Sequence, residues 1–410
     1  MAERRVAVTG AGIVSPIGNT LEDFQRSLCD ARPGIRRLPG EIAQRSGVQV
    51  AATVEWNPMS VLKENEAAGV DRATQFALGA ASQALAASGL ETRAAPERIG
   101  VYWGTGLGGA STQEAAYRQV YGADEWRLRP LTVVMAMSNA AGSNVAVRHS
   151  LRGPFANFAT ACSSSAMALG EAMRTIQAGR ADAMVAGGSE ALLTPVMLLA
   201  WQALRTLAPA DATDPAASCK PFDKHRGGLV LGEGAAAFVL EDESRARARR
   251  APILALLSGY GNSCDALHMS RPDRDGQVRA MREALAESGV SPGDIGYINA
   301  HGTATAVGDV VEAEAINAVF GELAAHIPAS STKSLHGHLL GGAGALEFAA
   351  ALLPILRGWL PPTAWLEEPD PACMLRHVPR RAERVDPPRA VMSNSFAFGG
   401  SNVVLVAERA

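Results

Sequence analysis

Cys162 is the residue whose sequence surroundings most favour a chemical role. It follows the short apolar run "ANFATA" and precedes "SSSAMALGEAM", where serines suited to helix capping lead into small and apolar residues at helical spacing. A cysteine in the first turn of a helix lies beside unpaired N–H groups and the positive end of the helix dipole. Both favour the thiolate and lower the thiol pKa. The pattern predicts a nucleophile, although a small buried thiol is the common alternative.

Two histidine motifs in the second half of the chain offer partners for such a thiol. His301 comes shortly after the apolar run "IGYI", in "NAHGTATAVGD". Lys333, His336 and His338 lie in "STKSLHGHLLGGAGALE", a glycine-rich loop that leads into a helix. A thiolate can hold an acyl group as a thioester, and two neutral N–H donors can stabilise an enolate formed by loss of carbon dioxide. The combination therefore suits acyl transfer coupled to decarboxylation.

Two other uses of the histidines remain as alternatives. His336 and His338 could bind a metal ion with Asp309 or Glu312, but two imidazoles in one glycine-rich loop are a weak signal. A cysteine–histidine hydrolase needs a single base and an activated water rather than two histidines. The sequence assigns no chemical role to His336, for which packing or solvent exposure is the default expectation.

The elements that must position these residues form an internal duplication. "ALAASGL" at 84–90 returns as "ALAESGV" at 284–290, and "RIGVYWGTG" is matched just downstream by "DIGYINAHGT". The matched segments begin at residues 84 and 284, so the repeating unit is 200 residues long. A unit of this length indicates two duplicated domains, because solenoid repeats are far shorter. We place the domains at residues 1–250, which carry the cysteine, and 251–410, which carry the two histidines.

Each half alternates short apolar strands with amphipathic helical segments such as 75–89, a pattern typical of sheets covered by helices. Two stacked sheets with helices between and outside them predict an α/β fold with layers α/β/α/β/α. In such sheets, binding sites lie beyond the carboxyl ends of strands. Cys162, His301 and His338 all fall at turns of this kind, in equivalent parts of the two halves.

The glycine-rich segment "TGAGIVSPIG" near the N-terminus is not expected to bind a dinucleotide. Ser15 takes the position of the third glycine, and Pro16 would disturb the helix that should face the pyrophosphate. We expect a tight structural turn here instead.

Composition excludes several other classes of function. A net charge of -3 from 38 basic and 41 acidic residues argues against nucleic-acid binding. The five cysteines lack zinc-site spacing and suit a reducing compartment. The run "LEFAAALLPIL" contains Glu347 and Pro354 and has about half of the ~20 residues that span a bilayer. We therefore expect a cytoplasmic protein without membrane insertion.

Four motifs in order, "TACSSS", "NAHGTATAVGD", "TKSLHGHLLGGAGALE" and "NSFAFGGSN", resemble those of the β-ketoacyl-[acyl carrier protein] synthases of the elongating Cys-His-His type. The likeness runs from "VAVTGAGIVSPIG" to the C-terminus. The resemblance implies the thiolase fold, which agrees with the duplication. It also implies an acyltransferase, a 3-oxoacyl-[acyl carrier protein] synthase of fatty acid or polyketide-like biosynthesis, that needs no redox or metal cofactor.

The resemblance also assigns roles. Cys162 takes the acyl chain from a phosphopantetheine thioester, while His301 and His338 hold the malonyl thioester and stabilise its enolate. The backbone N–H groups of Cys162 and Phe398 form the oxyanion hole, and the Phe398 ring gates the site. Supporting groups are Lys333 and Glu312, as a charged pair, and Asp309. Substrate-binding residues are Thr303, Thr305, Met137 and Phe396, and carrier-docking residues are Arg127, Arg129 and Arg205.

Two related functions stay as alternatives to the condensing enzyme. A non-catalytic partner subunit of the chain-length-factor type lacks the cysteine, whereas Cys162 is present here. A thiolase uses a second cysteine near the C-terminus, where this chain reads "SNSFAFGGSN". The resemblance implies acyl and malonyl carrier proteins as partners, and a homodimer, with a heterodimer of related subunits as the other possibility.

Overall fold

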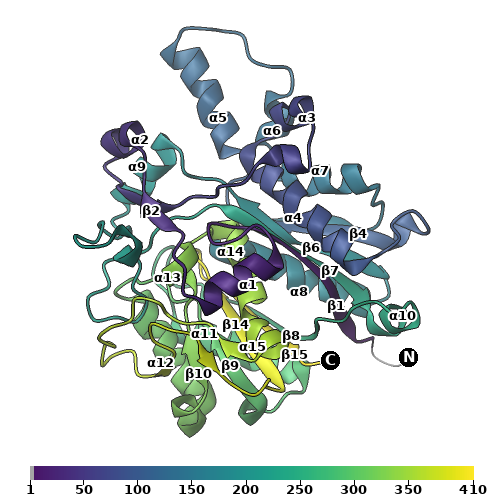
Figure 1. Cartoon of the computed structure of the whole chain (residues 1–410), viewed down its shortest axis with the longest axis vertical. Coiled ribbons are helices and arrows are strands. Elements are labelled where there is room, and N and C mark those ends of the chain that lie inside the picture. Colours follow the sequence, from purple (N-terminus) through teal and green to yellow (C-terminus); the bar gives the residue numbers. More distant parts are fainter. Residues whose placement is uncertain (1–3) are drawn as a thin grey trace.

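The computed structural model describes residues 4–410, and its core is a mixed sheet of eleven strands (Figure 1). The order is β12-β10-β9-β14-β15-β8-β1-β7-β6-β4-β5. The N-terminal half contributes β1 (Val6–Val14), β4 (Ile99–Gly104), β5 (Phe155–Phe158), β6 (Ala183–Glu190) and β7 (Gly234–Asp242). The C-terminal half contributes β8 (Ala255–Cys264), β9 (Ile295–Asn299), β10 (Pro328–Ser330), β12 (Arg376–His377), β14 (Ala390–Phe396) and β15 (Ser401–Glu408).

The two halves repeat one topology. The order β5-β4-β6-β7-β1 of the first half corresponds to β10-β9-β14-β15-β8 of the second, and parallel and antiparallel pairings agree strand by strand. The halves meet where β1 pairs with β8 through Val6, Ala7 and Val8. The predicted pair of sheets is therefore joined edge to edge at this short ladder.

Helices form the remaining layers. α8 (Ser164–Gln177) and α14 (Ala343–Ala351) contact each other and strands of both halves, so they lie between the two groups of strands. α4 (Arg72–Ser88) and α7 (Ala140–His149) cover the outer face of the first half, and α11 (Arg274–Ser288) and α12 (Gly308–Phe320) belong to the outer layer of the second. The predicted α/β fold with layers α/β/α/β/α is confirmed. The boundary at residue 250 stays a prediction, between α10 and β8.

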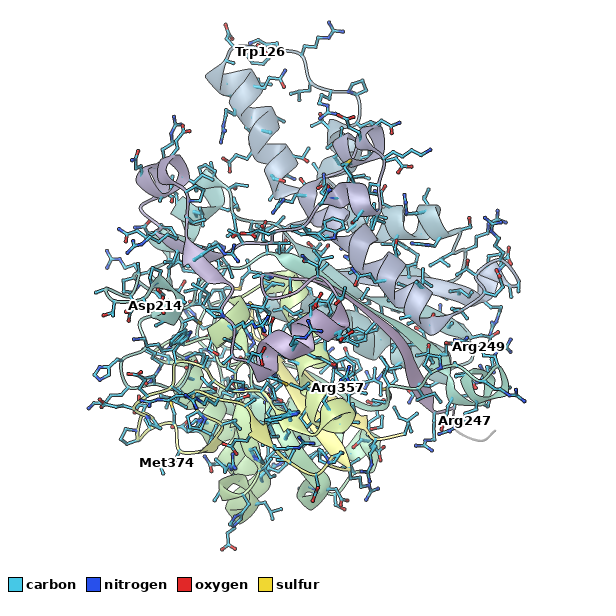
Figure 2. All side chains as sticks on the ribbon, in the orientation of Figure 1. Trp126, Asp214, Arg247, Arg249, Arg357 and Met374 are labelled. Carbon is cyan, nitrogen blue, oxygen red and sulfur yellow. The ribbon has the colours of Figure 1, made fainter. Side chains whose placement is uncertain are left out.

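Shorter elements surround this body. They are α1 (Leu21–Cys29), α2 (Gly40–Ser46), α3 (Glu64–Ala68), α5 (Ala110–Tyr117), α6 (Thr132–Ala136), α9 (Pro195–Ala203), α10 (Glu243–Ala248), α13 (Lys333–His336) and α15 (Leu353–Arg357), with the strand pairs β2 (Ile35–Arg37)–β3 (Val50–Ala52) and β11 (Trp359–Leu360)–β13 (Glu383–Arg384). Residues 110–136, here called the arm, project from the body at the top of Figure 1, with Trp126 at the tip (Figure 2).

Equivalent glycines bring a helix close to a strand in each half. Gly10 and Gly12 lie inside β1, and the predicted tight turn follows at Ser15–Gly18, where the Ser15 N–H donates to the Gly18 carbonyl oxygen over 3.0 Å. A Cβ atom at Gly12 would lie 2.0 Å from the Ala80 carbonyl oxygen of α4. In β8, a Cβ at Gly261 would lie 1.8 Å from the Ala280 carbonyl oxygen of α11. These glycines are therefore required by the packing of the helix on the strand.

The apolar segment at Leu340–Arg357 is longer than the sequence suggested. It has 18 residues with a mean hydropathy of 1.4, and 89% of it is buried within the fold. It comprises α14, α15 and the turn before them, packed against both groups of strands. By length and composition alone this segment could cross a membrane, but its burial inside the fold is that of a core segment covered on all sides.

Candidate active site

Two matching turns form the centre of the site. Cys162 lies in the 3-10 turn Ala161–Ser163 that opens α8, and Gly341 occupies the corresponding place in the turn Leu340–Gly342 that opens α14. Ala161 and Leu340 have φ values of 50° and 48°, a left-handed conformation that surrounding contacts must hold for a residue with a side chain. Each half therefore aims a helix N-terminus at the centre of the molecule.

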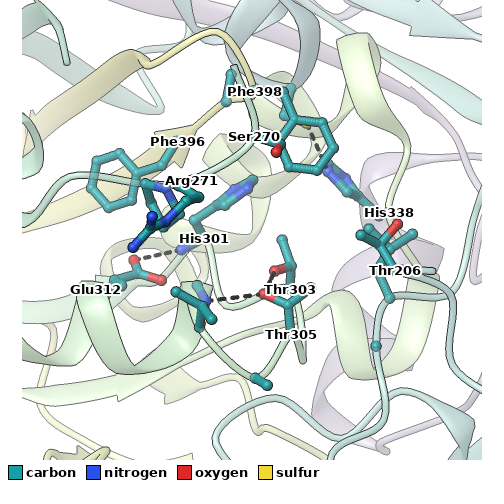
Figure 3. A pocket seen from close by; sticks show the side chains of 18 of the residues that line it. Thr206, Ser270, Arg271, His301, Thr303, Thr305, Glu312, His338, Phe396 and Phe398 are labelled. Carbon is teal, nitrogen blue, oxygen red and sulfur yellow. Dashed lines mark hydrogen bonds between the residues drawn. The ribbon is translucent and has the colours of Figure 1, made fainter. Parts of the chain in front are cut away.

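The structure brings Cys162, His301 and His338 together. Nε2 of His338 lies 3.1 Å from Sγ of Cys162, and one side-chain N or S atom from each of the three residues lies within 4.8 Å of the others. All three residues are buried, and the two imidazole rings lie nearly perpendicular with centroids 5.4 Å apart (Figure 3). The duplicated halves thus contribute one nucleophile and two imidazoles to a single site.

Hydrogen bonds fix which imidazole nitrogens carry protons. The Leu340 backbone N–H donates to Nδ1 of His338 over 3.3 Å, and Nζ of Lys333 lies 3.3 Å from Nδ1 of His301. An ammonium group can only donate, so both Nδ1 atoms act as acceptors and both Nε2 atoms carry hydrogen. Burial, reinforced by Lys333, lowers the pKa of both histidines well below 6.5. The site therefore presents two neutral N–H donors beside the thiol.

The tautomers of His301 and His338 also disfavour metal binding. A metal ligand needs a bare ring nitrogen, but Nδ1 of each site histidine is already taken by a donor and Nε2 is protonated. The alternative cluster around His336 does not form. Its Nδ1 donates to the Gly337 carbonyl oxygen over 2.8 Å, and its Nε2 accepts from the Thr332 hydroxyl over 2.9 Å. His336 is a fully buried packing residue, as the default expectation had it.

The predicted lowering of the Cys162 pKa is wrong for this structure. Burial raises the pKa of the thiol to about 12, while Lys333 and the backbone N–H groups of Phe398 and Cys162 act in the opposite direction. The Sγ atom is removed from water, so desolvation outweighs the stabilisation expected at a helix N-terminus. Burial therefore favours the protonated thiol in this structure. The same two backbone N–H groups are those assigned to the oxyanion hole.

The charged pair behind the histidines differs from the expected one. Lys333 forms its ion pair with Glu347 of α14, not with Glu312, and Lys333 and Glu347 are both fully buried. Nζ of Lys333 also donates to the His301 carbonyl oxygen over 2.6 Å. The sequence analysis named Glu347 only as a charge within an apolar run and did not predict its role in the site. The sequence did contain a clue to this role, because Glu347 is the only charged residue of the otherwise apolar segment that forms α14. A charge in a buried helix needs a partner of opposite charge.

Glu312 and Asp309 of α12 hold backbone instead. Glu312 accepts the backbone N–H groups of His301 over 2.8 Å and of Gly302 over 2.7 Å, which fixes the turn that carries the imidazole. Asp309 accepts the Phe222 N–H over 2.7 Å, and burial raises its pKa to about 7. Glu312 therefore positions His301 directly, while Asp309 anchors a neighbouring loop.

A cavity of about 350 Å³ leads to the three reactive residues. Thr303, Thr305 and Phe396 line it, and the two threonine hydroxyls are 3.0 Å apart (Figure 3). The Phe398 ring stacks on Trp201 of α9 with centroids 5.9 Å apart. The residues after Phe398, Gly399 and Gly400, have φ values of 84° and 77°, which favour glycine.

The predicted docking and acyl-pocket residues divide into two groups. Arg205 lines the cavity, together with Arg271, which sequence reasoning did not single out. Arg127 and Arg129 lie on the arm, where Arg129 donates to the Ala68 carbonyl oxygen. Met137 follows the arm and is partly exposed, and neither it nor the two arm arginines lines the cavity formed by residues 4–410.

Comparison with known proteins identifies the family. The β-ketoacyl synthase N-terminal domain model matches residues 3–246, and the β-ketoacyl synthase C-terminal domain model matches residues 254–367. The chain therefore belongs to the β-ketoacyl synthase family. It is 40% identical to the 3-oxoacyl-[acyl-carrier-protein] synthase 2 of Coxiella burnetii, over 100% of this chain and 99% of that protein.

Solved structures agree with this assignment. The ishigamide ketosynthase/chain length factor superposes with a TM-score of 0.92 and 33% identity over the whole of both chains. A type II polyketide synthase acyl-carrier protein in complex with its ketosynthase bound to the hexaketide gives a TM-score of 0.91 and 30% identity, again over the whole of both chains. The predicted family and thiolase-like fold are confirmed.

Proposed function

We propose that this chain is a 3-oxoacyl-[acyl-carrier-protein] synthase that condenses a malonyl group with an acyl group held on Cys162. The observation that carries the proposal is the convergence of one thiol and two neutral imidazoles, with a ring nitrogen of each histidine and Sγ of Cys162 all within 4.8 Å of one another. Relatives named for this activity cover the whole chain. Both substrates are thioesters of acyl carrier protein, in fatty acid or polyketide-like biosynthesis.

The first half-reaction loads the enzyme. Sγ of Cys162 forms a bond to the carbonyl carbon of the acyl thioester, and the bond from that carbon to the pantetheine sulfur breaks. The Cys162 proton leaves with that sulfur. The backbone N–H groups of Cys162 and Phe398 stabilise the oxyanion of the tetrahedral intermediate.

The second half-reaction makes the carbon–carbon bond. His301 and His338 donate from Nε2 to the malonyl thioester oxygen, where negative charge gathers as the carboxylate leaves as carbon dioxide. The enolate carbon then attacks the acyl carbonyl, the bond from that carbon to Sγ of Cys162 breaks, and the departing thiolate takes up a proton from solvent. Neutral imidazoles suit this step, because they donate to the enolate oxygen without protonating it beforehand.

Mass spectrometry of the intact protein tests the proposal. Incubation with acyl carrier proteins that bear saturated, unsaturated or aryl acyl groups is expected to add the acyl mass to the wild type and not to Cys162→Ala. Absence of acylation of the wild type by any donor would contradict the proposal and favour a non-catalytic subunit. Acylation of Cys162→Ala would place the nucleophile elsewhere.

The arm supports the proposal that two copies associate. Several of its apolar side chains are largely exposed, among them Tyr121, Trp126 and Val133, and β5 forms one edge of the sheet within residues 4–410. Apolar groups gathered on one face mark an interface, and an open strand edge invites pairing. We propose a homodimer in the cytoplasm that meets its carrier at the cavity mouth near Arg205.

Light scattering at micromolar concentration is expected to give twice the chain mass of 42.7 kDa for the wild type. Val133→Asp on the arm should shift the protein toward a monomer, since a carboxylate resists burial in an apolar interface. Leu267→Asp, at another exposed apolar side chain outside the arm, is the matched control and should remain dimeric. A wild-type monomer would contradict the homodimer.

A further inference from the structure

Glu190 is a buried carboxylate that the mechanism above does not use. It ends β6, is fully buried, and gathers donors from both halves. The N–H groups of Gly106 and Gly341 donate to Oε2, over 2.5 and 3.1 Å. The Thr105 hydroxyl and the Leu107 N–H donate to Oε1, over 3.2 and 3.4 Å. No ion pair to Glu190 occurs within residues 4–410, so neutral donors alone stabilise it.

One of these donors belongs to the turn that orients a site histidine. The Leu340 N–H donates to Nδ1 of His338, and the next N–H along the chain, that of Gly341, donates to Glu190. Adjacent peptide groups of one turn therefore connect His338 to Glu190. Between them lies Leu340 at a φ of 48°, a conformation that needs external support.

The backbones on either side of Glu190 approach closely. A Cβ at Gly341 would lie 2.2 Å from the Gly106 nitrogen, so the space between these two donors admits no larger side chain at position 341. Without the Glu190 acceptor, the buried Gly341 N–H group and the buried Thr105 hydroxyl would lose their partner. Four donors converge on two oxygens, which suits a carboxylate and not a neutral amide, whose NH₂ group would face other donors.

The duplication explains why a carboxylate stands here. Thr105 follows β4 as His301 follows β9, and Gly341 opens α14 as Cys162 opens α8. The first half thus repeats the arrangement of turns that forms the active site. At the place where the active site has its substrate cavity, the first half has the Glu190 carboxylate.

We propose that Glu190 is a positioning residue that holds the Leu340–Gly341 turn and thereby aims Nε2 of His338 at the malonyl thioester. The proposal rests on the function proposed above. Glu190 acts through the imidazole and does not touch substrate. Its influence falls mainly on the decarboxylation step, where Nε2 of His338 donates to the substrate. Acyl transfer is affected less, because its oxyanion is held by the backbone N–H groups of Cys162 and Phe398, and His338 contributes there only through its contact with Sγ of Cys162.

Glu190→Gln tests the proposal by comparing the two half-reactions. Conversion of malonyl carrier to acetyl carrier is expected to fall about 10- to 100-fold, as displacement of a reacting group by about 1 Å can cause. Acylation of Cys162 should fall clearly less, because its oxyanion is held by backbone N–H groups and not by His338. Glu190→Asp keeps the charge, but its shorter side chain reaches less far toward Gly341. The ratio of decarboxylation to acylation should therefore fall less than in Glu190→Gln. This variant replaces Glu190→Gln in the test if Glu190→Gln does not fold.

Asp71→Asn is the matched control. Asp71 is also buried and accepts hydrogen bonds from Ala73, Ser111 and Thr112 without an ion pair among residues 4–410, but none of these partners belongs to the turn that carries His338. It should lower stability and leave the ratio of half-reactions unchanged. Equal loss of both half-reactions in the Glu190 variants would overturn the proposal. A wild type without acylation would overturn the function as well, so the two failures are distinguishable.

Discussion

His301→Ala is expected to slow decarboxylation of malonyl carrier protein by about 10²–10³-fold, the typical effect of removing one donor to a developing oxyanion. Acylation of Cys162 should change only a few-fold, because its oxyanion is held by backbone N–H groups and His338, not His301, is hydrogen-bonded to Sγ. The measurement is mass spectrometry of the carrier, for malonyl to acetyl conversion, and of the enzyme, for acyl transfer.

His336→Ala is the control for the loss of a buried imidazole. His336 is as buried as the site histidines but bonds only to Thr332 and Gly337. Its removal should lower the free energy of unfolding and affect both half-reactions alike. Retention of full decarboxylation in His301→Ala would contradict the assignment of an enolate-stabilising donor to His301.

Lys333→Met is expected to destabilise the protein by about 3–5 kcal/mol, because it leaves Glu347 as a buried charge without its partner. The variant should also lose decarboxylation, since Nδ1 of His301 loses the donor that keeps its proton on Nε2. Urea unfolding gives the first quantity, and the carrier assay gives the second.

The double variant Lys333→Met/Glu347→Leu separates these two effects. Replacing both members of a buried ion pair with apolar residues is often close to neutral for stability. We expect most of the unfolding free energy to return while decarboxylation stays low. Recovery of both would mean that the pair serves the fold alone and that His301 keeps its tautomer without Lys333.

The reactive residues could be predicted from sequence because each lies at a recognisable strand-to-helix or strand-to-loop turn. Cys162 and His301 follow apolar runs, and the duplication places these turns at equivalent points of two sheets. The pKa of Cys162 could not be predicted in the same way. A helix N-terminus can be read from the sequence, whereas the burial of Sγ depends on packing between the two halves.

Long-range partners were harder to predict. Glu312 was expected to pair with Lys333, but α12 turns its carboxylate to the backbone of His301, and Glu347 from α14 meets the ammonium group. Glu190 drew no attention, since a glutamate after a strand resembles a surface residue until its donors are known. Arg127 and Arg129 share residue type with Arg205 but lie on the arm, a placement that no local pattern encodes.

In the fold, too, features set by local sequence could be predicted and features set by distant packing could not. The repeat predicted two equivalent halves, and helix limits follow local signals, since α4 and α11 are both capped by aspartate, at Asp71 and Asp273, and both end at a left-handed glycine. The role of Gly12 depended on a helix that packs on its strand from about 70 residues away.

The division of the site between the halves has a consequence for folding kinetics. Cys162 and His338 are 176 residues apart in the chain, and Ser163 bonds to Ser401 across 238 residues. Contacts of such sequence separation form slowly, because loop closure must precede the interactions that reward it. During refolding, secondary structure should return well before enzymatic activity. The rate at which activity returns would therefore report the rate at which one half docks on the other.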